Sequence, residues 1–149
     1  MKVKDIMNTN VKTAQADTPV RSIVEVMCFN KISGLPVVDA NNNVVGVVSE
    51  KDVLRKMFPD ISDVAREEGV PDFERMEKDY TDALSLKTGD IMSRLVASAT
   101  PEMPVMKAVS MMCVQKIRRI PVLEGSKLVG IISLGDVHKA IFANSLKAS

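Results

Sequence analysis

An internal duplication with an offset of 85 residues constrains the fold of this chain more than any other feature of its sequence. Residues 5–39 match residues 90–124 without a gap, with identical amino acids at 14 of 35 positions. Asp5-Ile6-Met7 recurs as Asp90-Ile91-Met92, and Pro36-Val37 recurs as Pro121-Val122. One residue fewer in the second copy then changes the offset to 84. Because a fixed offset indicates tandem copies of one structural unit, the two halves should share a fold.

Each copy shows the same succession of secondary-structure signals. A short extended segment, residues 11–13 or 96–98, leads to a proline that suits the first turn of a helix. Apolar residues at positions 20, 23, 24 and 27 then follow the spacing of a half-buried helix. Two β-branched runs, residues 36–38 and 44–48, flank a hairpin loop, and a second helix is expected from Glu50 to about Phe58. The order strand, helix, strand, strand, helix predicts a mixed fold of the α/β (α+β) class.

The chain divides into a first repeat at 1–58, an acidic helical insert or linker at 59–88, and a second repeat at 89–149. A repeat of about 55 residues buries little core alone, so the two should pack about a pseudo-twofold axis into one compact module with two related clefts. The insert has nine acidic and four basic residues, so it carries −5 while the remainder carries +6. This asymmetry fits an anionic ligand held by the repeats, and equally a solvated helix on a mildly basic body.

Overall composition excludes several classes of protein. The net charge is +1 with 26% charged residues, which argues against a polybasic nucleic-acid binder. No apolar run approaches the roughly 20 residues that cross a bilayer, and the first ten residues lack the apolar core of a signal peptide. Two cysteines in a chain without an export signal point to reduced thiols in the cytoplasm.

Signatures of catalysis are scarce. His138 is the single histidine, so neither a histidine-rich metal site nor a symmetric acid–base pair can form. Cys28 and Cys113 lie beside the apolar stripes of equivalent helices and are expected to be small residues of the core. The two common glycine-rich phosphate loops are missing as well. We therefore expect no enzyme, no catalytic residue and no metal site.

A doubled string places Ser and Asp three residues apart where a strand is followed by a helix. The pairs are Ser49 with Asp52 and Ser133 with Asp136. At a helix N-terminus, a serine hydroxyl and free backbone N–H groups suit a phosphate, and an aspartate can accept hydrogen bonds from a ribose diol. The same atoms also make an ordinary N-cap with an acidic residue in the first turn. Spacing alone favours the cap and leaves both interpretations open.

These doubled motifs resemble the cystathionine-β-synthase (CBS) domain, here as a tandem pair. The resemblance rests on Asp-Ile-Met, a Pro-Val helix start, Lys-Ile followed by Pro-Val, and the glycine-to-aspartate string, each present twice in the same order. It implies a β-α-β-β-α unit and a paired module with two clefts. Such modules commonly bind adenosine compounds (AMP, ADP, ATP or S-adenosylmethionine), and often act as sensors after dimerising.

The resemblance also implies roles for individual residues. Asp52 and Asp136 would bind ribose hydroxyls, while Ser49 and Ser133 would approach the sugar or phosphate. The clefts of the family are crossed, so the adenine-side wall of each comes from the other repeat's opening segment. That wall would be Asn8, Val11 and Lys12 in the Asp136 cleft, and Ser93, Val96 and Ala97 in the Asp52 cleft. Adenine held by backbone and aliphatic groups fits a chain with only 3% aromatic residues.

The copies differ where a phosphate group is expected. Arg118-Arg119 precede Ile120 in the second copy, a place where family members that bind phosphorylated nucleosides often have a basic pair. The first copy has Ser33-Gly34 instead. Because arginine can form bidentate, charge-assisted bonds to phosphate, the Asp136 cleft is predicted to be the stronger nucleotide site. A basic pair on a solvated edge strand is the alternative.

We expect a regulatory, ligand-sensing homodimer whose adenosine-type ligand alters its geometry or stability, which a separate effector protein then detects. Two other functions are kept as alternatives. One is nucleic-acid binding through a basic face, for which Lys2, Lys4, Lys12, Arg118 and Arg119 are the candidates and which the near-neutral charge disfavours. The other is a purely structural adaptor with empty clefts.

Overall fold

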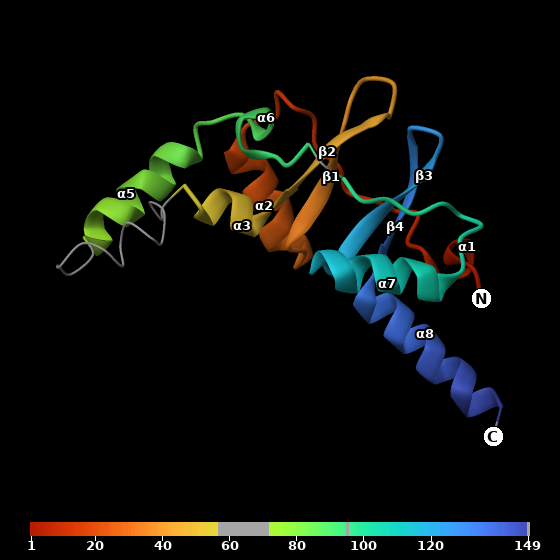
Figure 1. The fold of residues 1–149 in the computed structure, drawn as a ribbon. Coiled ribbons are helices and arrows are strands. Elements are labelled where there is room, and N and C mark those ends of the chain that lie inside the picture. Colours follow the sequence, from red (N-terminus) through yellow and green to blue (C-terminus); the bar gives the residue numbers. More distant parts are fainter. Residues whose placement is uncertain (57–71, 95, 149) are drawn as a thin grey trace. The chain divides into compact units, whose positions relative to one another are not determined.

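The computed structural model describes residues 1–56, 72–94 and 96–148 (Figure 1). The chain forms two compact units, and each takes segments from both repeats. Unit 1 comprises Met1–Val11, Ala40–Val44 and Leu95–Ser149, and unit 2 comprises Lys12–Asp39 and Val45–Arg94. The opening segment of each repeat therefore belongs to the unit that contains the helices and sheet of the other repeat.

Both units contain a one-turn helix, a long helix, a two-stranded sheet and a helix after it, and unit 2 also contains α5 of the insert. Unit 1 has the helices α1 (Val3–Ile6), α7 (Val105–Gln115) and α8 (Leu134–Lys147), and the strands β3 (Arg119–Glu124) and β4 (Lys127–Ser133). Unit 2 has the helices α2 (Val20–Asn30), α3 (Glu50–Leu54), α5 (Phe73–Ala83) and α6 (Thr88–Ile91), with β1 (Gly34–Val38) and most of β2 (Val44–Ser49). This confirms the predicted mixed fold built from two repeats.

The helices α2 and α7 begin and end in the same way. Pro19 and Pro104 are their N-caps, so each proline directly precedes the helix and its missing N–H breaks no helical hydrogen bond. Lys31 and Lys116 end the two helices in the left-handed conformation, with φ of 53° and 56°. The predicted apolar stripes face the cores, where Val20, Ile23 and Met27 are buried.

Each sheet is a two-stranded hairpin. In unit 1, β3 and β4 are antiparallel with Arg119 opposite Ser133, and the register shifts between Val122 and Leu123. The extended segments predicted at 11–13 and 96–98 do not form strands. Contact with each sheet is made one residue later, through a single parallel bridge from Ala14 to Val37 and from Ala99 to Val122. Both alanines are buried. Their small side chains let the segment pack closely on the sheet.

Each unit has its own hydrophobic core. In unit 1 the core includes Val3, Met112, Ile120, Ile132 and Val137, so the N-terminal helix α1 contributes to the core of the second repeat. In unit 2 the equivalent cluster includes Ile23, Val37 and Val48. Burial of this apolar area is the main favourable contribution to folding in each unit.

The insert is described only in its second half, since residues 59–71 lie outside the described part of the chain. There, Asp72 caps α5 by accepting a hydrogen bond from the Arg75 N–H at 3.1 Å, and Tyr80 packs against the core of unit 2. The predicted end of the second helix at Phe58 also lies outside the described residues, and α3 ends at Leu54.

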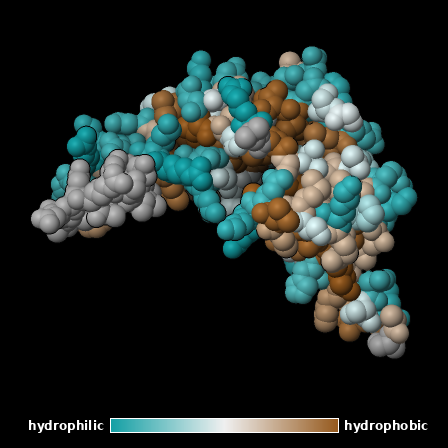
Figure 2. All heavy atoms as spheres, viewed as in Figure 1, coloured by the Kyte–Doolittle hydropathy of each residue, from teal (hydrophilic) through white to brown (hydrophobic). Residues whose placement is uncertain are grey.

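The surface of α8 is partly apolar. Figure 2 shows hydrophobic side chains among hydrophilic ones along this helix towards the C-terminus, and Phe142 and Leu146 are among its exposed residues. None of the helices in the described residues is both long and apolar enough to cross a membrane.

Candidate functional site

The N-terminus of α8 brings together the Ser133–Asp136 pair. Ser133 is the N-cap residue, and its hydroxyl accepts a hydrogen bond from the Asp136 N–H at 3.1 Å. The Asp136 carboxylate is half-buried and forms no hydrogen bond or ion pair with any residue that the structure describes. The capping interpretation therefore accounts for the serine and leaves the carboxylate available as an acceptor.

The equivalent pair at α3 has a different arrangement. The Asp52 carboxylate accepts hydrogen bonds from the Ser49 N–H at 2.8 Å and from the Ser49 hydroxyl at 3.2 Å. Arg55 also lies 3.8 Å from this carboxylate. Because its neighbours already satisfy Asp52, a ligand at this aspartate would have to displace an existing contact. The two copies thus differ in how much of the aspartate is free to bind.

The arginine pair lies beside the start of α8. Arg119 is opposite Ser133 in the hairpin, and the Arg118 carbonyl accepts a hydrogen bond from the Leu134 N–H at 2.9 Å. Arg118 is exposed and Arg119 is half-buried, whereas Ile120 is fully buried in the core of unit 1. Two guanidinium groups are therefore attached to the residues that border the helix N-terminus.

The first copy is more tightly packed at the matching position. Gly34 corresponds to Arg119, and a Cβ added there would lie 2.9 Å from the Val48 carbonyl oxygen and 3.4 Å from the Ser49 Cα. Ser33 repeats the backbone contact of Arg118, since its carbonyl accepts from the Glu50 N–H at 2.9 Å. A basic side chain at position 34 would thus require the backbone to shift.

The opening segments lie on the opposite repeat's sheet, as the predicted crossing requires. In unit 1, Asn8 and Ile131 exchange two backbone hydrogen bonds, both of 2.9 Å. In unit 2, Ser93 and Val47 exchange the same pair of bonds, again at 2.9 Å. A Cβ on Gly130 would meet Met7, whose Sδ would lie 2.8 Å away, so glycine allows this close approach.

The other predicted wall residues are not brought together within one unit. Val11 is half-buried in unit 1, while Lys12 is exposed and is the first residue of unit 2. Val96 and Ala97, predicted for the Asp52 cleft, belong to unit 1, where Ala97 packs against the core. Within its own unit, the Asp136 pair therefore shares its sheet with Asn8, and the Asp52 pair shares its sheet with Ser93.

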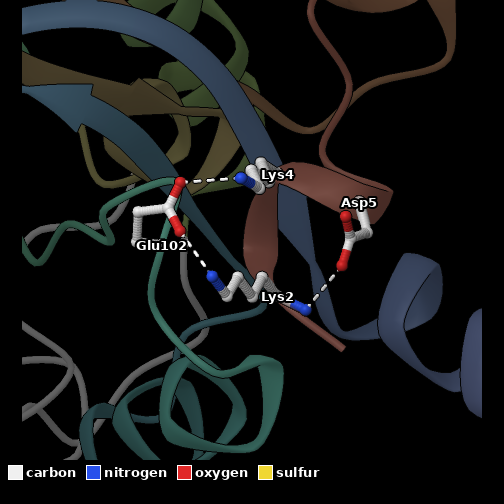
Figure 3. A network of polar contacts seen from close by, with 4 residues as sticks. All are labelled: Lys2, Lys4, Asp5 and Glu102. Carbon is white, nitrogen blue, oxygen red and sulfur yellow. Dashed lines mark hydrogen bonds and ion pairs between the residues drawn. The ribbon is translucent and has the colours of Figure 1, made fainter.

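Sequence inspection missed a network of charged residues at the N-terminus (Figure 3). Lys2 and Lys4 each donate a hydrogen bond to one carboxylate oxygen of Glu102, at 2.7 and 2.8 Å. The bond from Lys2, followed by that from Lys4, lowers the pKa of Glu102 to about 2. The hydrogen bond with Glu102 in turn raises the pKa of Lys4. The only sequence signal for this network was a difference between the copies, since Lys4 in the first copy corresponds to Gly89 in the second.

This network also removes part of the predicted basic face. Two of its five candidates, Lys2 and Lys4, pair with Glu102, whose single negative charge offsets one of their two positive charges. A surface that attracts nucleic acid needs uncompensated cationic groups in a contiguous patch, so the pairing weakens that alternative.

The residues considered for other chemistry lie at the surface. Cys28 and Cys113 are exposed free thiols, so the prediction that they are core residues is wrong. Each follows a buried methionine in its helix, and the next position turns about 100° away from the core. His138 is exposed on α8. No group of three or more histidine, cysteine or acidic side chains in the described ranges could hold a metal ion.

Comparison with known proteins identifies one family. The sequence matches the family described as CBS domain at residues 3–59 and again at residues 89–143. An uncharacterized protein of Methanocaldococcus jannaschii, MJ1426, is 29% identical over 155 residues, covering 95% of this chain and 91% of its own length. The chloroplastic CBSX2 protein of Arabidopsis thaliana is 27% identical over 144 residues, and the match spans only 58% of that protein.

Solved structures of similar chains have the same fold. A crystal structure of CBSX2 from Arabidopsis thaliana is 26% identical with a TM-score of 0.78, covering 99% of this chain and 97% of that one. A crystal structure of CBSX2 in complex with AMP is 27% identical with a TM-score of 0.75, covering 97% of this chain and 98% of that one.

Proposed function

Because this chain belongs to the CBS-domain family, we propose that it is a regulatory module that senses an adenosine-containing nucleotide at the N-terminus of α8. One observation carries the proposal. Asp136 is half-buried, and its carboxylate has no partner among the described residues. It lies in the first turn of the 14-residue helix α8, whose N-cap residue Ser133 is opposite Arg119 of the arginine pair. The AMP complex of the similar protein CBSX2 supports the choice of ligand class.

Each part of such a ligand has a matching group in unit 1. The N-terminus of α8 and the guanidinium groups of Arg118 and Arg119 suit a phosphate, since both supply donors and positive potential. The Asp136 carboxylate can accept hydrogen bonds from two ribose hydroxyls, and the Ser133 hydroxyl can donate to the sugar or phosphate. Within unit 1, we assign the adenine-side wall to Asn8 and Val11, whose backbone groups and aliphatic surface require no aromatic ring.

The equivalent site in unit 2 is proposed to bind the same class of ligand more weakly. Its residues within unit 2 are Ser49, Asp52 and Ser93. Asp52 already accepts two hydrogen bonds, and Gly34 replaces the second arginine. Binding at this site therefore loses existing contacts and gains no charge-assisted bond to phosphate.

We propose that the output is an altered homodimer that a separate cytoplasmic effector protein detects, without catalysis by this chain. Phe29 on α2 and Val114 on α7 occupy equivalent positions and are 85% and 81% exposed. Covering an exposed apolar side chain removes it from water, so we propose each of these two positions as a point of contact in the dimer. A second copy of the chain provides the same two side chains in return, which is the property of a twofold interface.

Calorimetric titration with AMP, ADP, ATP and S-adenosylmethionine tests this function. We expect wild type to bind at least one of them, Asp136→Ala to lose most of that affinity, and the matched variant Asp52→Ala to keep the stronger binding event. Equal binding by wild type and Asp136→Ala would refute the assignment of the principal site. If no adenosine compound bound and the melting temperature stayed constant, a structural adaptor would be the better account.

A further inference from the structure

Residues 1–8, here called the N-terminal strap, are fixed to the second repeat at two places. At one end, the N–H groups of Val3 and Lys4 donate to the carbonyls of Met103 and Pro101, both at 2.9 Å. The Val3 side chain is fully buried in the core of unit 1. At the other end, Asn8 pairs with Ile131 on β4, the strand that leads to Ser133. The strap therefore connects the turn before α7 to the proposed nucleotide site.

Unit 2 contains an equivalent strap with the same backbone contacts. The N–H groups of Thr88 and Gly89 donate to the carbonyls of Thr18 and Ala16, both at 2.8 Å. Ser93 pairs with Val47, as Asn8 does with Ile131. The backbone arrangement is thus common to both units and does not depend on the charges near it.

The side chains over the two straps differ. In unit 1, Glu102 lies between Lys2 and Lys4 and is bonded to both (Figure 3). In unit 2 the corresponding residues are Asp17, Lys87 and Gly89, and Asp17 forms no ion pair with Lys87 within the described segments. Because the second strap is docked without these ion pairs, the pairs at Glu102 are not needed to form the strap. They are an additional restraint in the unit that carries the arginine pair.

We propose that Glu102 is a positioning residue for the nucleotide site: its two ion pairs hold the N-terminal strap on the second repeat and thereby hold Asn8 beside β4. This proposal rests on the proposed function of the Asp136 site. Between the two ends of the strap, α1 is a single turn, and the Lys2 N–H caps it by donating to Asp5 at 2.8 Å. A restraint at Lys2 and Lys4 is therefore transmitted through a short, hydrogen-bonded element.

The physical effect is preorganisation. A strap that moves in the free protein must be immobilised when a ligand contacts Asn8, and that loss of freedom weakens binding. With the strap already restrained by Glu102, less conformational entropy is lost on binding. The ion pairs are exposed, so their contribution is modest and should decrease as salt screens them.

Titration with AMP at low and high salt tests the proposal on wild type, Glu102→Gln and the matched variant Asp17→Asn. We expect Glu102→Gln to bind AMP about three- to tenfold more weakly than wild type at low salt, from two exposed ion pairs. The difference should become smaller near about 1 M NaCl, where the screening length falls to about 3 Å. Asp17→Asn should bind as wild type does at both salt concentrations.

A second measurement separates positioning from a general loss of stability. Amide hydrogen exchange at Asn8 and Ile131 in the ligand-free protein should be faster in Glu102→Gln, with the core amides of α7 unchanged. The charge-reversed protein with Lys2→Glu, Lys4→Glu and Glu102→Lys should recover most of the AMP affinity. Wild-type affinity of Glu102→Gln at low salt, or an equal loss in Asp17→Asn, would overturn the proposal. If wild type bound no AMP, the nucleotide function would fail, and exchange at Asn8 would still decide whether Glu102 positions the strap.

Discussion

Asp52 and Asp136 show how two equivalent residues acquire different properties from their neighbours. The Asp52 carboxylate is held by Ser49 and approached by Arg55, whereas the Asp136 carboxylate has no partner in the described segments. The hairpin places an arginine next to the second pair and a glycine next to the first. A few side chains on a common backbone therefore make the two sites different.

The arginine pair should discriminate by charge. Replacing Arg118 and Arg119 by alanine is expected to lower the affinity for AMP about ten- to a hundredfold, because the charge-assisted hydrogen bonds to phosphate are lost. Affinity for adenosine, which has no phosphate, should change by less than about twofold in calorimetry. An equal loss for both ligands would show that the arginines support the fold of the site rather than bind phosphate.

The charges around Glu102 predict a defined pH dependence. Its pKa is lowered to about 2 in the folded protein, so its contribution to stability is complete above the unfolded pKa of 4.5 and is lost as the pH falls towards 2. The pKa of Lys4 is raised above 10.5, so the contribution of Lys4 to stability is complete below that value and is lost at higher pH. The difference in unfolding free energy between wild type and Glu102→Gln should therefore be constant between about pH 5 and pH 10. A difference that disappeared by pH 6 in urea titrations would contradict this expectation.

At the scale of elements, the start of the second helix differs between the repeats because the residues that precede it differ. Gly34 allows β1 to approach Val48 and Ser49 on β2, where a side chain would come within 2.9 Å of a backbone oxygen. In the second repeat, β3 carries Arg119 at this position and still pairs with Ser133. The two hairpins are therefore similar in topology and different in the space beside the helix N-terminus.

Two glycine substitutions should have opposite effects on stability. Gly34→Ala is expected to destabilise the protein by about 1–3 kcal/mol, because the added methyl group needs a backbone shift. Gly135→Ala, in the first turn of α8, should stabilise it by about 0.5–1 kcal/mol, since alanine favours helix and the nearest atom, Ser133 Oγ, would be 3.8 Å away. Urea unfolding of both variants measures these changes. A stable Gly34→Ala protein would mean that the hairpin relaxes more easily than its packing indicates.

At the scale of the whole molecule, ligand binding and association should both be visible in bulk measurements. AMP at a concentration of 100 times its dissociation constant is expected to stabilise the folded protein by about 2.7 kcal/mol and to raise its melting temperature. The same concentration should leave the melting temperature of Asp136→Ala almost unchanged. A similar shift in both proteins would place the ligand elsewhere.

Association should depend on the exposed apolar residues of equivalent helices. Replacing Phe29 and Val114 by serine is expected to convert a dimer into a monomer, because the apolar contact across the interface is lost. Light scattering coupled to size exclusion measures the mass. Cys28→Ser and Cys113→Ser, which change adjacent exposed positions conservatively, provide the control. An unchanged dimer in the serine double variant would show that other surfaces associate.

The sequence by itself determined the duplication, the order helix, strand, strand, helix within each repeat and the places of the Ser–Asp pairs, because these depend on local spacing, propensity and capping. The strands that it predicted at 11–13 and 96–98 do not form. It missed the exposure of Cys28 and Cys113, since a position beside an apolar stripe can face either way. Only the tertiary structure decided that Asn8 pairs with Ile131, that Ser49 binds Asp52, and that Lys2 and Lys4 meet Glu102. The Glu102 contacts join residues 98 and 100 positions apart, and Asn8 is still farther along the chain from Ile131. The orientation of Ser49 towards Asp52 is one of several local hydrogen-bonding arrangements that these two residues allow.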